Sequence, residues 1–348
     1  MPVNNDSKMN FLQNSFFFFA SMIMLGYLLV IGKSIIIPFV IATFFWYLIN
    51  ALAHKIVNMT TFSEKTSLFL AFVVITLAVA GFVQVTKDNV QAFIEQAPAY
   101  QANINIFIDK FTAKFGTVDL SGARDIVKKV NFGGLAAGIV AAVSSVATMT
   151  ITILIYLAFL FLEQSSFSWK LKALFPKKEN RKNAEDILQK VGRSLESYIG
   201  LKTLASIGMG ICGYAVLVIM GVDNAVFWAL IFGLLNFIPY VGPFIGTALP
   251  VFAALVQFGD FSSALVVLGG LVAVAFIIGN IIEPKLFGNS LNLSPLVILL
   301  SLAIWGSLWG IIGMILCIPM MVSLMIILYQ FDGLRPYALL MSEKEKTE

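Results

Sequence analysis

The sequence predicts an all-α polytopic membrane protein with six to eight transmembrane helices. Of its 348 residues, 59% are hydrophobic and 12% are charged, whereas a soluble domain carries about 25% charged residues. Apolar runs long enough to cross a bilayer, about 20 residues, recur along the chain. Two long apolar segments in the C-terminal third, 227–256 and 293–328, are interrupted by Pro and Gly. We expect both to be broken helices or re-entrant hairpins, and we favour hairpins.

The first 86 residues are expected to hold three spans, at 16–32, 35–52 and 68–85. A turn of two residues after position 32 places the first two spans in an antiparallel hairpin.

Residues 87–134 have a different character, because charges alternate in sign and apolar residues recur at helical spacing. This is the pattern of solvent-facing amphipathic helices. We expect a small extracytoplasmic domain of two or three helices, punctuated by Pro98 and by residues 116–122. A fourth span then follows at 135–162.

Residues 163–202 form a second polar block, which we expect on the cytoplasmic side. It carries nine basic and five acidic residues, and its apolar residues make a helical stripe. Those residues are Ile187, Leu188, Val191, Leu195, Tyr198 and Ile199. A basic amphipathic helix beside a span is typical of a helix lying on the cytoplasmic leaflet. Packing of the stripe on the protein's own inner face would explain the pattern equally well.

Residues 203–330 form the segment that we call the transport core, and 331–348 are expected to be a cytoplasmic tail. The apolar run 293–328 would measure roughly 54 Å as a straight helix, but the hydrocarbon core is only about 30 Å thick. The excess length favours a chain that folds back. The positions where the two broken segments can bend or pack closely are Gly246, Pro250, Gly306, Gly310 and Pro319.

The segment 227–256 contains the candidate substrate site. Pro lacks a backbone donor and clashes with the preceding helical turn, so a helix should stop near position 236 and restart near 243. In lipid, such non-helical backbone is tolerated only when it is buried in protein or lines a wet cavity. A broken helix at this depth therefore indicates a binding site, although a Pro-kinked helix that only packs remains an alternative. The candidate residues are Asn236, Pro239, Tyr240, Gly242 and Pro243.

Asn280 and Glu283 extend this candidate site from the end of the preceding apolar run. An ionisable residue at the end of a span is a default functional hypothesis. The alternative is an interfacial carboxylate that caps a helix or pairs with Lys285. The amides of Asn236 and Asn280 can both donate and accept hydrogen bonds, which suits a small, hydroxyl-rich solute. A dedicated ion pore would be expected to carry several buried carboxylates.

No pattern in the sequence indicates catalysis, a metal site or a cofactor. It contains no Gly-rich phosphate loop ending in Lys-Ser/Thr, no His-Glu-x-x-His and no Cys-x-x-Cys. Cys212 and Cys317 both sit in apolar runs without metal-ligand spacing. We therefore expect no enzyme activity, no cofactor, no metal and no nucleic-acid partner.

Basic residues near the span ends place both termini and the 163–202 block in the cytoplasm and 87–134 outside. With single crossings at 227–256 and 293–328 the chain would cross eight times, and with two hairpins six times. The two topologies differ only in the side of the membrane on which the loop 283–292 lies. This loop is outside if the chain crosses eight times and in the cytoplasm if it crosses six times.

The motif at 236–243, Asn-Phe-Ile-Pro-Tyr-Val-Gly-Pro, together with Glu283-Pro284-Lys285 and Leu293-Ser294-Pro295, resembles the autoinducer-2 exporter family of bacterial inner-membrane permeases. The resemblance covers nearly the whole chain. It implies export of a small molecule, with the quorum-sensing signal autoinducer-2 as the substrate of one branch and Na⁺/H⁺ exchange linked to others. The same resemblance implies that the protein is a homo-oligomer, most simply a pentamer as in other members of that family.

Three functions remain open from the sequence. The first is a secondary transporter that exports a small polar metabolite, such as an autoinducer-2-like signal. The second is a cation/proton antiporter that uses Na⁺ or H⁺ as coupling ion and Glu283 as the carrier. The third is a non-transporting membrane scaffold.

Overall fold

The structure is a computed structural model that describes residues 5–115, 149–287 and 292–343, and its regular elements there are helices. Six described helical segments are long and apolar enough to cross a membrane, and a bent pair, Met149–Gln164 with Phe167–Leu174, is a seventh candidate. The predicted all-α polytopic fold is therefore confirmed. The labelled elements are α1 (Asn5–Ile31), α2 (Lys33–Met59), α3 (Glu64–Phe115), α6 (Phe167–Leu174), α7 (Lys178–Ile219), α8 (Ala225–Leu235), α9 (Val241–Phe258), α10 (Phe261–Phe276), η1 (Ile277–Ile282), α11 (Glu283–Phe287), α12 (Pro295–Tyr329) and α13 (Arg335–Met341).

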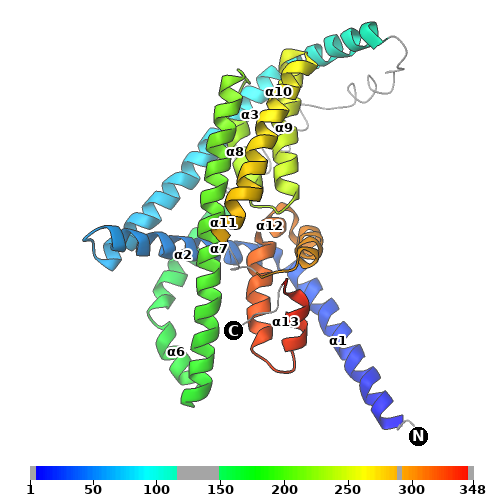
Figure 1. Ribbon diagram of the computed structural model, residues 1–348. Coiled ribbons are helices and arrows are strands. Elements are labelled where there is room, and N and C mark those ends of the chain that lie inside the picture. The colour runs from blue at the N-terminus through cyan, green and yellow to red at the C-terminus, as the bar shows by residue number, and fades with distance from the viewer. Residues whose placement is uncertain (1–4, 116–148, 288–291, 344–348) are drawn as a thin grey trace.

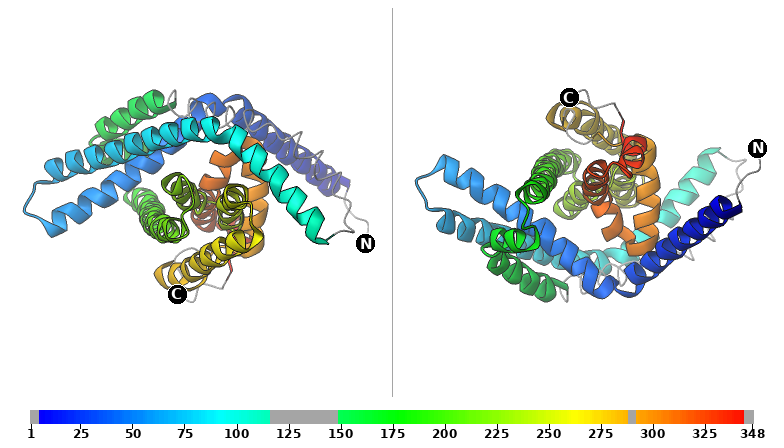
Figure 2. Two further views of the ribbon diagram at one scale, coloured as in Figure 1. Left: turned by 90° about the horizontal axis from the view of Figure 1, so that it is seen from above. Right: turned by 90° about the horizontal axis from the view of Figure 1, so that it is seen from below.

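The helices form two layers (Figures 1 and 2). We call α1, α2, α3 and the helix Met149–Gln164 the N-terminal layer. A hydrophobic cluster around Ala42, Ile49 and Leu157 holds α2, α3 and Met149–Gln164 together, and Gln164 accepts a hydrogen bond from the Trp46 indole at 2.9 Å. The second layer is the transport core, which packs along the long helix α7.

α3 is one continuous helix of 52 residues. The predicted domain boundary at residue 86 therefore falls inside a helix, and the third span continues without a break into the first part of the predicted extracytoplasmic domain. Residue 98 lies within the helix, so the proline there does not end it: a proline removes one hydrogen bond, and the bonds of the flanking turns can continue. Residues 116–134 of that predicted domain, and 135–148 of the predicted fourth span, lie outside the described residues.

α7 similarly joins the predicted cytoplasmic helix and the fifth span into one helix of 42 residues. The predicted boundary at 202/203 lies within it. The C-terminal end of the apolar stripe packs inside the protein, because Tyr198 and Ile199 belong to a buried cluster with residues of α12 and α13. Leu188, nearer the start of α7, remains exposed.

The segment 227–256 folds as a helical hairpin, which we call the first hairpin (α8, residues 236–240 and α9). Both of its ends lie together, because the Gln257 amide donates to the Gly221 carbonyl at 2.9 Å and accepts from the Asp223 backbone N–H at 2.7 Å. These bonds join the start of α8 to the end of α9. The break predicted near residues 236–243 is the tip of this hairpin, and Gly246 and Pro250 are buried in α9.

The segment 293–328 is broken at Gly310 into two helical arms at a steep angle to each other (Figure 1), and we call this broken segment the second hairpin (α12). The turn is at Gly310, whose φ of 65° and ψ of −143° are non-helical and are accessible essentially only to glycine. The chain folds tightly around it: a Cβ built on Gly313 would lie 2.0 Å from the Trp305 carbonyl oxygen, eight residues earlier. Gly306 faces Met314 of the other arm, and Pro319 is buried inside the second arm.

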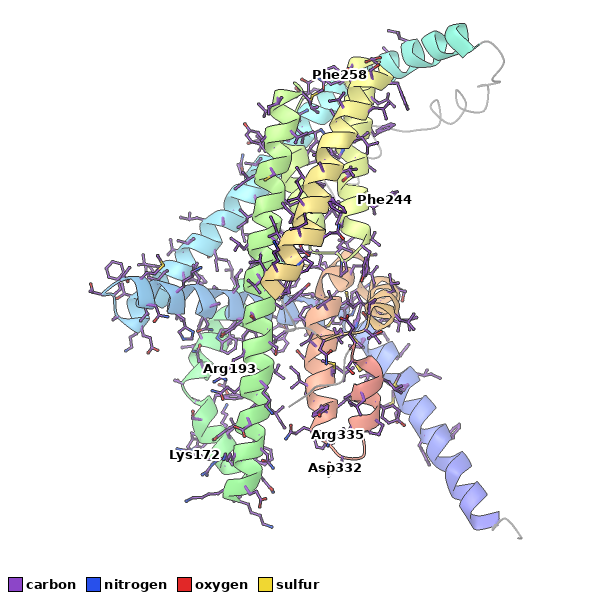
Figure 3. All side chains as sticks on the ribbon, viewed as in Figure 1. Lys172, Arg193, Phe244, Phe258, Asp332 and Arg335 are labelled. Atoms are coloured by element: carbon purple, nitrogen blue, oxygen red, sulfur yellow. The ribbon has the colours of Figure 1, made fainter. Side chains whose placement is uncertain are left out.

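The tail residues after α12 are hydrogen-bonded to the entrance of the second hairpin. Leu293 and Ser342 form an antiparallel bridge, and Ser294 donates its N–H to the Met341 carbonyl at 2.9 Å. Charged residues gather at this end of the molecule, as Lys172, Arg193, Asp332 and Arg335 show in Figure 3, whereas Phe258 marks the opposite end.

The hairpin topology predicts that both ends of the first hairpin face the same side of the membrane. In a cysteine-free background (Cys212→Ser, Cys317→Ser), Asp223→Cys and Phe261→Cys should react with an impermeant thiol reagent from one side. Lys172→Cys, at the other end of the molecule, should react from the opposite side. Labelling of positions 223 and 261 from opposite sides would show a single crossing instead.

Gly310→Ala should lower the thermal unfolding temperature in detergent, because a Cβ at this backbone conformation costs about 1–3 kcal/mol. Gly269→Ala in α10 is the matched control, since nothing lies within 4 Å of a Cβ there. In a helix interior alanine is favoured over glycine by up to about 1 kcal/mol. Equal unfolding temperatures for the two variants would contradict the non-helical backbone conformation at Gly310.

Candidate functional site

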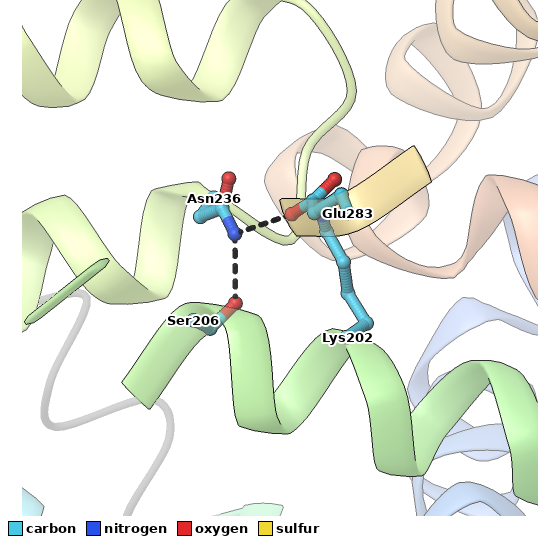
Figure 4. A network of polar contacts seen from close by, with 4 residues as sticks. All are labelled: Lys202, Ser206, Asn236 and Glu283. Carbon is cyan, nitrogen blue, oxygen red and sulfur yellow. Dashed lines mark hydrogen bonds and ion pairs between the residues drawn. The ribbon is translucent and has the colours of Figure 1, made fainter. Parts of the chain in front are cut away.

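Four side chains from three separate elements meet in what we call the polar cluster: Lys202, Ser206, Asn236 and Glu283 (Figure 4). The Lys202 ammonium lies 2.6 Å from Oε1 of Glu283. The Asn236 amide nitrogen donates to the same Oε1 at 3.0 Å and to Ser206 Oγ at 3.2 Å. Asn236 is 1% exposed and Lys202 is 6% exposed, so this is a hydrogen-bonded ion pair inside the protein.

α7 supplies one side of the cluster through residues four apart, which lie on the same helical face. Tyr198, Lys202 and Ser206 follow that spacing. α8 approaches this face very closely, because a Cβ on Gly233 would lie 2.7 Å from the Ser206 carbonyl oxygen. Glycine at position 233 thus brings the end of α8 within hydrogen-bonding reach of α7.

The tip of the first hairpin supplies Asn236. α8 ends at Leu235, and two successive short turns follow, from the Phe237 N–H to the Leu234 carbonyl and from the Ile238 N–H to the Leu235 carbonyl. Tyr240 then adopts φ 58° and ψ −51°, with a Val241 N–H to Pro239 carbonyl bond across it. This is close to the rare, strained classic γ-turn. The sharp reversal keeps Asn236 buried at the end of α8 while α9 starts in the opposite direction.

A π-helical segment, η1, determines which way Glu283 points. The buried positions of α10 and η1, Ala264, Val267, Leu271 and Ile278, follow α-helical spacing. Continued unchanged, that spacing would turn position 282 inward, yet Ile282 is exposed. A π turn accommodates an extra residue, which rotates the next residues along the chain by about 100°. Glu283 therefore faces α7.

Two acceptor oxygens of the cluster remain available. Figure 4 shows that Oδ1 of Asn236 and the second carboxylate oxygen of Glu283 both point away from α7. Within the described residues neither oxygen accepts a hydrogen bond, and the Glu283 side chain keeps 16% of its surface exposed. The two oxygens form an acceptor pair that suits a hydroxyl donor or a cation.

Tyr198 lies one helical turn from Lys202 and is 2% exposed. Its ring contacts Phe287, one turn beyond Glu283, with centroids 5.8 Å apart. Its hydroxyl has no hydrogen-bond partner among the described residues, and a buried polar group without a partner costs about 1–3 kcal/mol. The polar cluster thus borders an unsatisfied donor.

The structure brings together only part of the predicted site. Asn236 and Glu283 meet, whereas Asn280 is exposed and forms no described contact with them. Glu283 pairs with Lys202, and Lys285 is exposed. The other predicted residues shape the hairpin tip: Gly242 is buried, Pro239 and Pro243 are half-buried, and Tyr240 is exposed.

Lys202 and Ser206 were missed as site residues, although a signal was present. Lys202 continues the apolar stripe of α7 three and four residues after Ile199 and Tyr198, so it shares their buried face. By composition alone it is one of the nine basic residues of the 163–202 block. Among the described residues no group of three or more His, Cys, Asp or Glu side chains could hold a metal ion.

Removing one partner of the Lys202–Glu283 ion pair should destabilise the protein more than removing both charges. Lys202→Met leaves a buried carboxylate unpaired, which costs about 3–5 kcal/mol, so the unfolding temperature in detergent should fall. Adding Glu283→Gln should restore most of that loss. Glu185→Gln is the control, because its partner Arg181 lies 3.8 Å away in a partly exposed pair, worth about 0–1 kcal/mol. A double variant no more stable than Lys202→Met would contradict the pairing.

Known proteins and a protein family match this chain over nearly its whole length. A family model described as AI-2E family transporter matches residues 17–332. The chain is 27% identical over 334 residues to the AI-2 transport protein TqsA of Escherichia coli (strain K12), covering 93% of this chain and 96% of that protein. It is 25% identical to a putative transport protein of Haemophilus influenzae, over 90% and 92% of the two chains. It is 28% identical to the putative transport protein YhhT of Escherichia coli (strain K12), over 83% and 82%.

Proposed function

This chain belongs to the AI-2E transporter family, and on that premise we propose that it is a secondary transporter that exports a small, uncharged, hydroxyl-rich solute. The membrane-transporter class follows from the family and from the helices that can span a bilayer. Autoinducer-2 is our candidate substrate, because one relative is named as an AI-2 transport protein.

The observation that carries the proposal is the polar cluster at the tip of the first hairpin. Half-helix ends and unwound backbone at membrane depth are where transporters bind their substrates. The Lys202–Glu283 pair has no net charge, and the acceptor oxygens of Asn236 and Glu283 point to the same side. An uncharged solute can donate hydroxyls to both oxygens without breaking the ion pair.

Cation/proton exchange is the second candidate, and the buried carboxylate of Glu283 favours it. A cation at Glu283 would compete with the Lys202 ammonium, which already lies 2.6 Å from that carboxylate. Lys202→Met should then strengthen cation binding and change Na⁺-driven proton flux in vesicles. In the solute mechanism the same variant should impair solute export.

We also propose cytoplasmic termini and a homo-oligomer. Lys172, Arg193 and Arg335 lie at one end of the molecule (Figure 3), and excess basic charge marks the cytoplasmic side. α1 exposes large apolar side chains, including Phe16, Ile23 and Tyr27, which supports contact with lipid or another subunit.

Transport in proteoliposomes tests the proposal. With autoinducer-2 inside, wild-type protein should release it, and Asn236→Ala and Glu283→Gln should slow release at least about tenfold. Asn236→Ala removes a hydrogen bond to the Glu283 carboxylate, and Glu283→Gln removes the negative charge itself. A hydrogen bond to a charged group contributes about 1.5–3 kcal/mol.

Asn280→Ala is the matched control, because this amide is exposed and lies outside the polar cluster. It should release the solute at close to the wild-type rate. Wild-type release with full activity in Asn236→Ala and Glu283→Gln would remove the site assignment. No release by the wild type would exclude autoinducer-2 as substrate.

A further inference from the structure

A large cleft in the described part of the chain lies between the N-terminal layer and the transport core. Its volume is about 1590 Å³, and α2, α3, α7, α8, α9 and α12 line it. It uses a different face of α7 from the polar cluster: Gly200, Leu204 and Ile207 line the cleft, whereas Lys202 and Ser206 do not. The cleft is thus a separate feature from the proposed solute site.

The lining of the cleft is almost entirely apolar. Its polar members are Lys55, Thr86, Glu196, Ser197 and Thr203. Water enters a cavity only where several polar groups can bind it, and apolar cavities stay dry. A hydroxyl-rich solute would likewise leave most of its polar groups without partners here.

The cleft is open rather than enclosed, so its apolar lining contacts the surrounding medium. In a bilayer that medium is hydrocarbon, which is as apolar as the lining. An apolar occupant therefore suits the cleft better than water or a polar solute.

The cleft leaves several of its large apolar side chains accessible. Several lining residues are also exposed large hydrophobics: Val74, Leu204, Ile207, Ile245, Phe252 and Ile311. They belong to α3, α7, α9 and α12, all of which contain candidate membrane spans. Hydrocarbon from the surrounding bilayer would therefore meet a mostly apolar surface here.

We propose that the acyl chains of a bilayer phospholipid occupy this cleft and separate the N-terminal layer from the transport core. Both walls come from the same chain, so a flexible linear chain fits the space better than a second folded copy. The lipid would contact Ile238 at the tip of the first hairpin and Ile311 beside the turn of the second. Movement of either hairpin would then require the lipid to rearrange.

Two tryptophans allow a direct test, because Trp228 and Trp309 line the cleft although they are only 8% and 7% exposed. The full chain, with Trp228 as its single tryptophan and the others changed to Phe, is reconstituted in phosphatidylcholine brominated near the middle of its acyl chains. Bromine quenches tryptophan on contact. Trp228 should lose most of its emission relative to unbrominated lipid.

Gly200→Phe in the same background places a ring into the cleft, where nothing lies within 4 Å of a Cβ on residue 200, and should restore much of the emission. A protein that keeps only Trp309 gives a second reporter and preserves the indole bond to the Leu29 carbonyl. Unquenched emission from both reporters, or quenching that Gly200→Phe leaves unchanged, would overturn the proposal. Emission that instead depends on the protein-to-lipid ratio would assign the cleft to a second copy.

Discussion

The ion pair between Lys202 and Glu283 is the interaction on which the arrangement of the transport core depends. A charge inside a membrane protein must be paired and hydrogen-bonded, because there is little water to solvate it. Glu283 meets this demand through Lys202 and Asn236, both bound to the same carboxylate oxygen. The pair therefore joins α7, the tip of the first hairpin and α11. Each of these elements carries a local irregularity that serves the contact.

Those irregularities have separate physical causes. Gly233 allows α8 to approach the α7 backbone, the turn at Tyr240 reverses the chain directly after Asn236, and the π turn at 277–282 rotates Glu283 inward. Each is unfavourable or unusual taken alone, and π turns and strained turns are frequent at functional sites. Here all three bring the same four side chains together.

The structure separates two environments on opposite faces of α7. One face presents Lys202 and Ser206 to the polar cluster, and the other lines the apolar cleft with Leu204 and Ile207. The tip of the first hairpin touches both, through Asn236 on one side and Ile238 on the other. A solute at the cluster and hydrocarbon in the cleft would therefore act on the same short segment, residues 236–240.

The sequence by itself determined the polytopic helical class and the two broken segments, and it indicated Asn236 and Glu283 as candidate site residues. These follow from composition, from apolar run length against bilayer thickness, and from prolines and glycines, which act locally. The tertiary structure decided that α8 and α9 form a hairpin, because Gln257 joins residues more than 30 positions apart. It also decided the partner of Glu283, since Lys202 lies 81 residues away along the chain. Helical periodicity predicts which residues share a face, but a π turn changes that register, and only packing shows which faces meet.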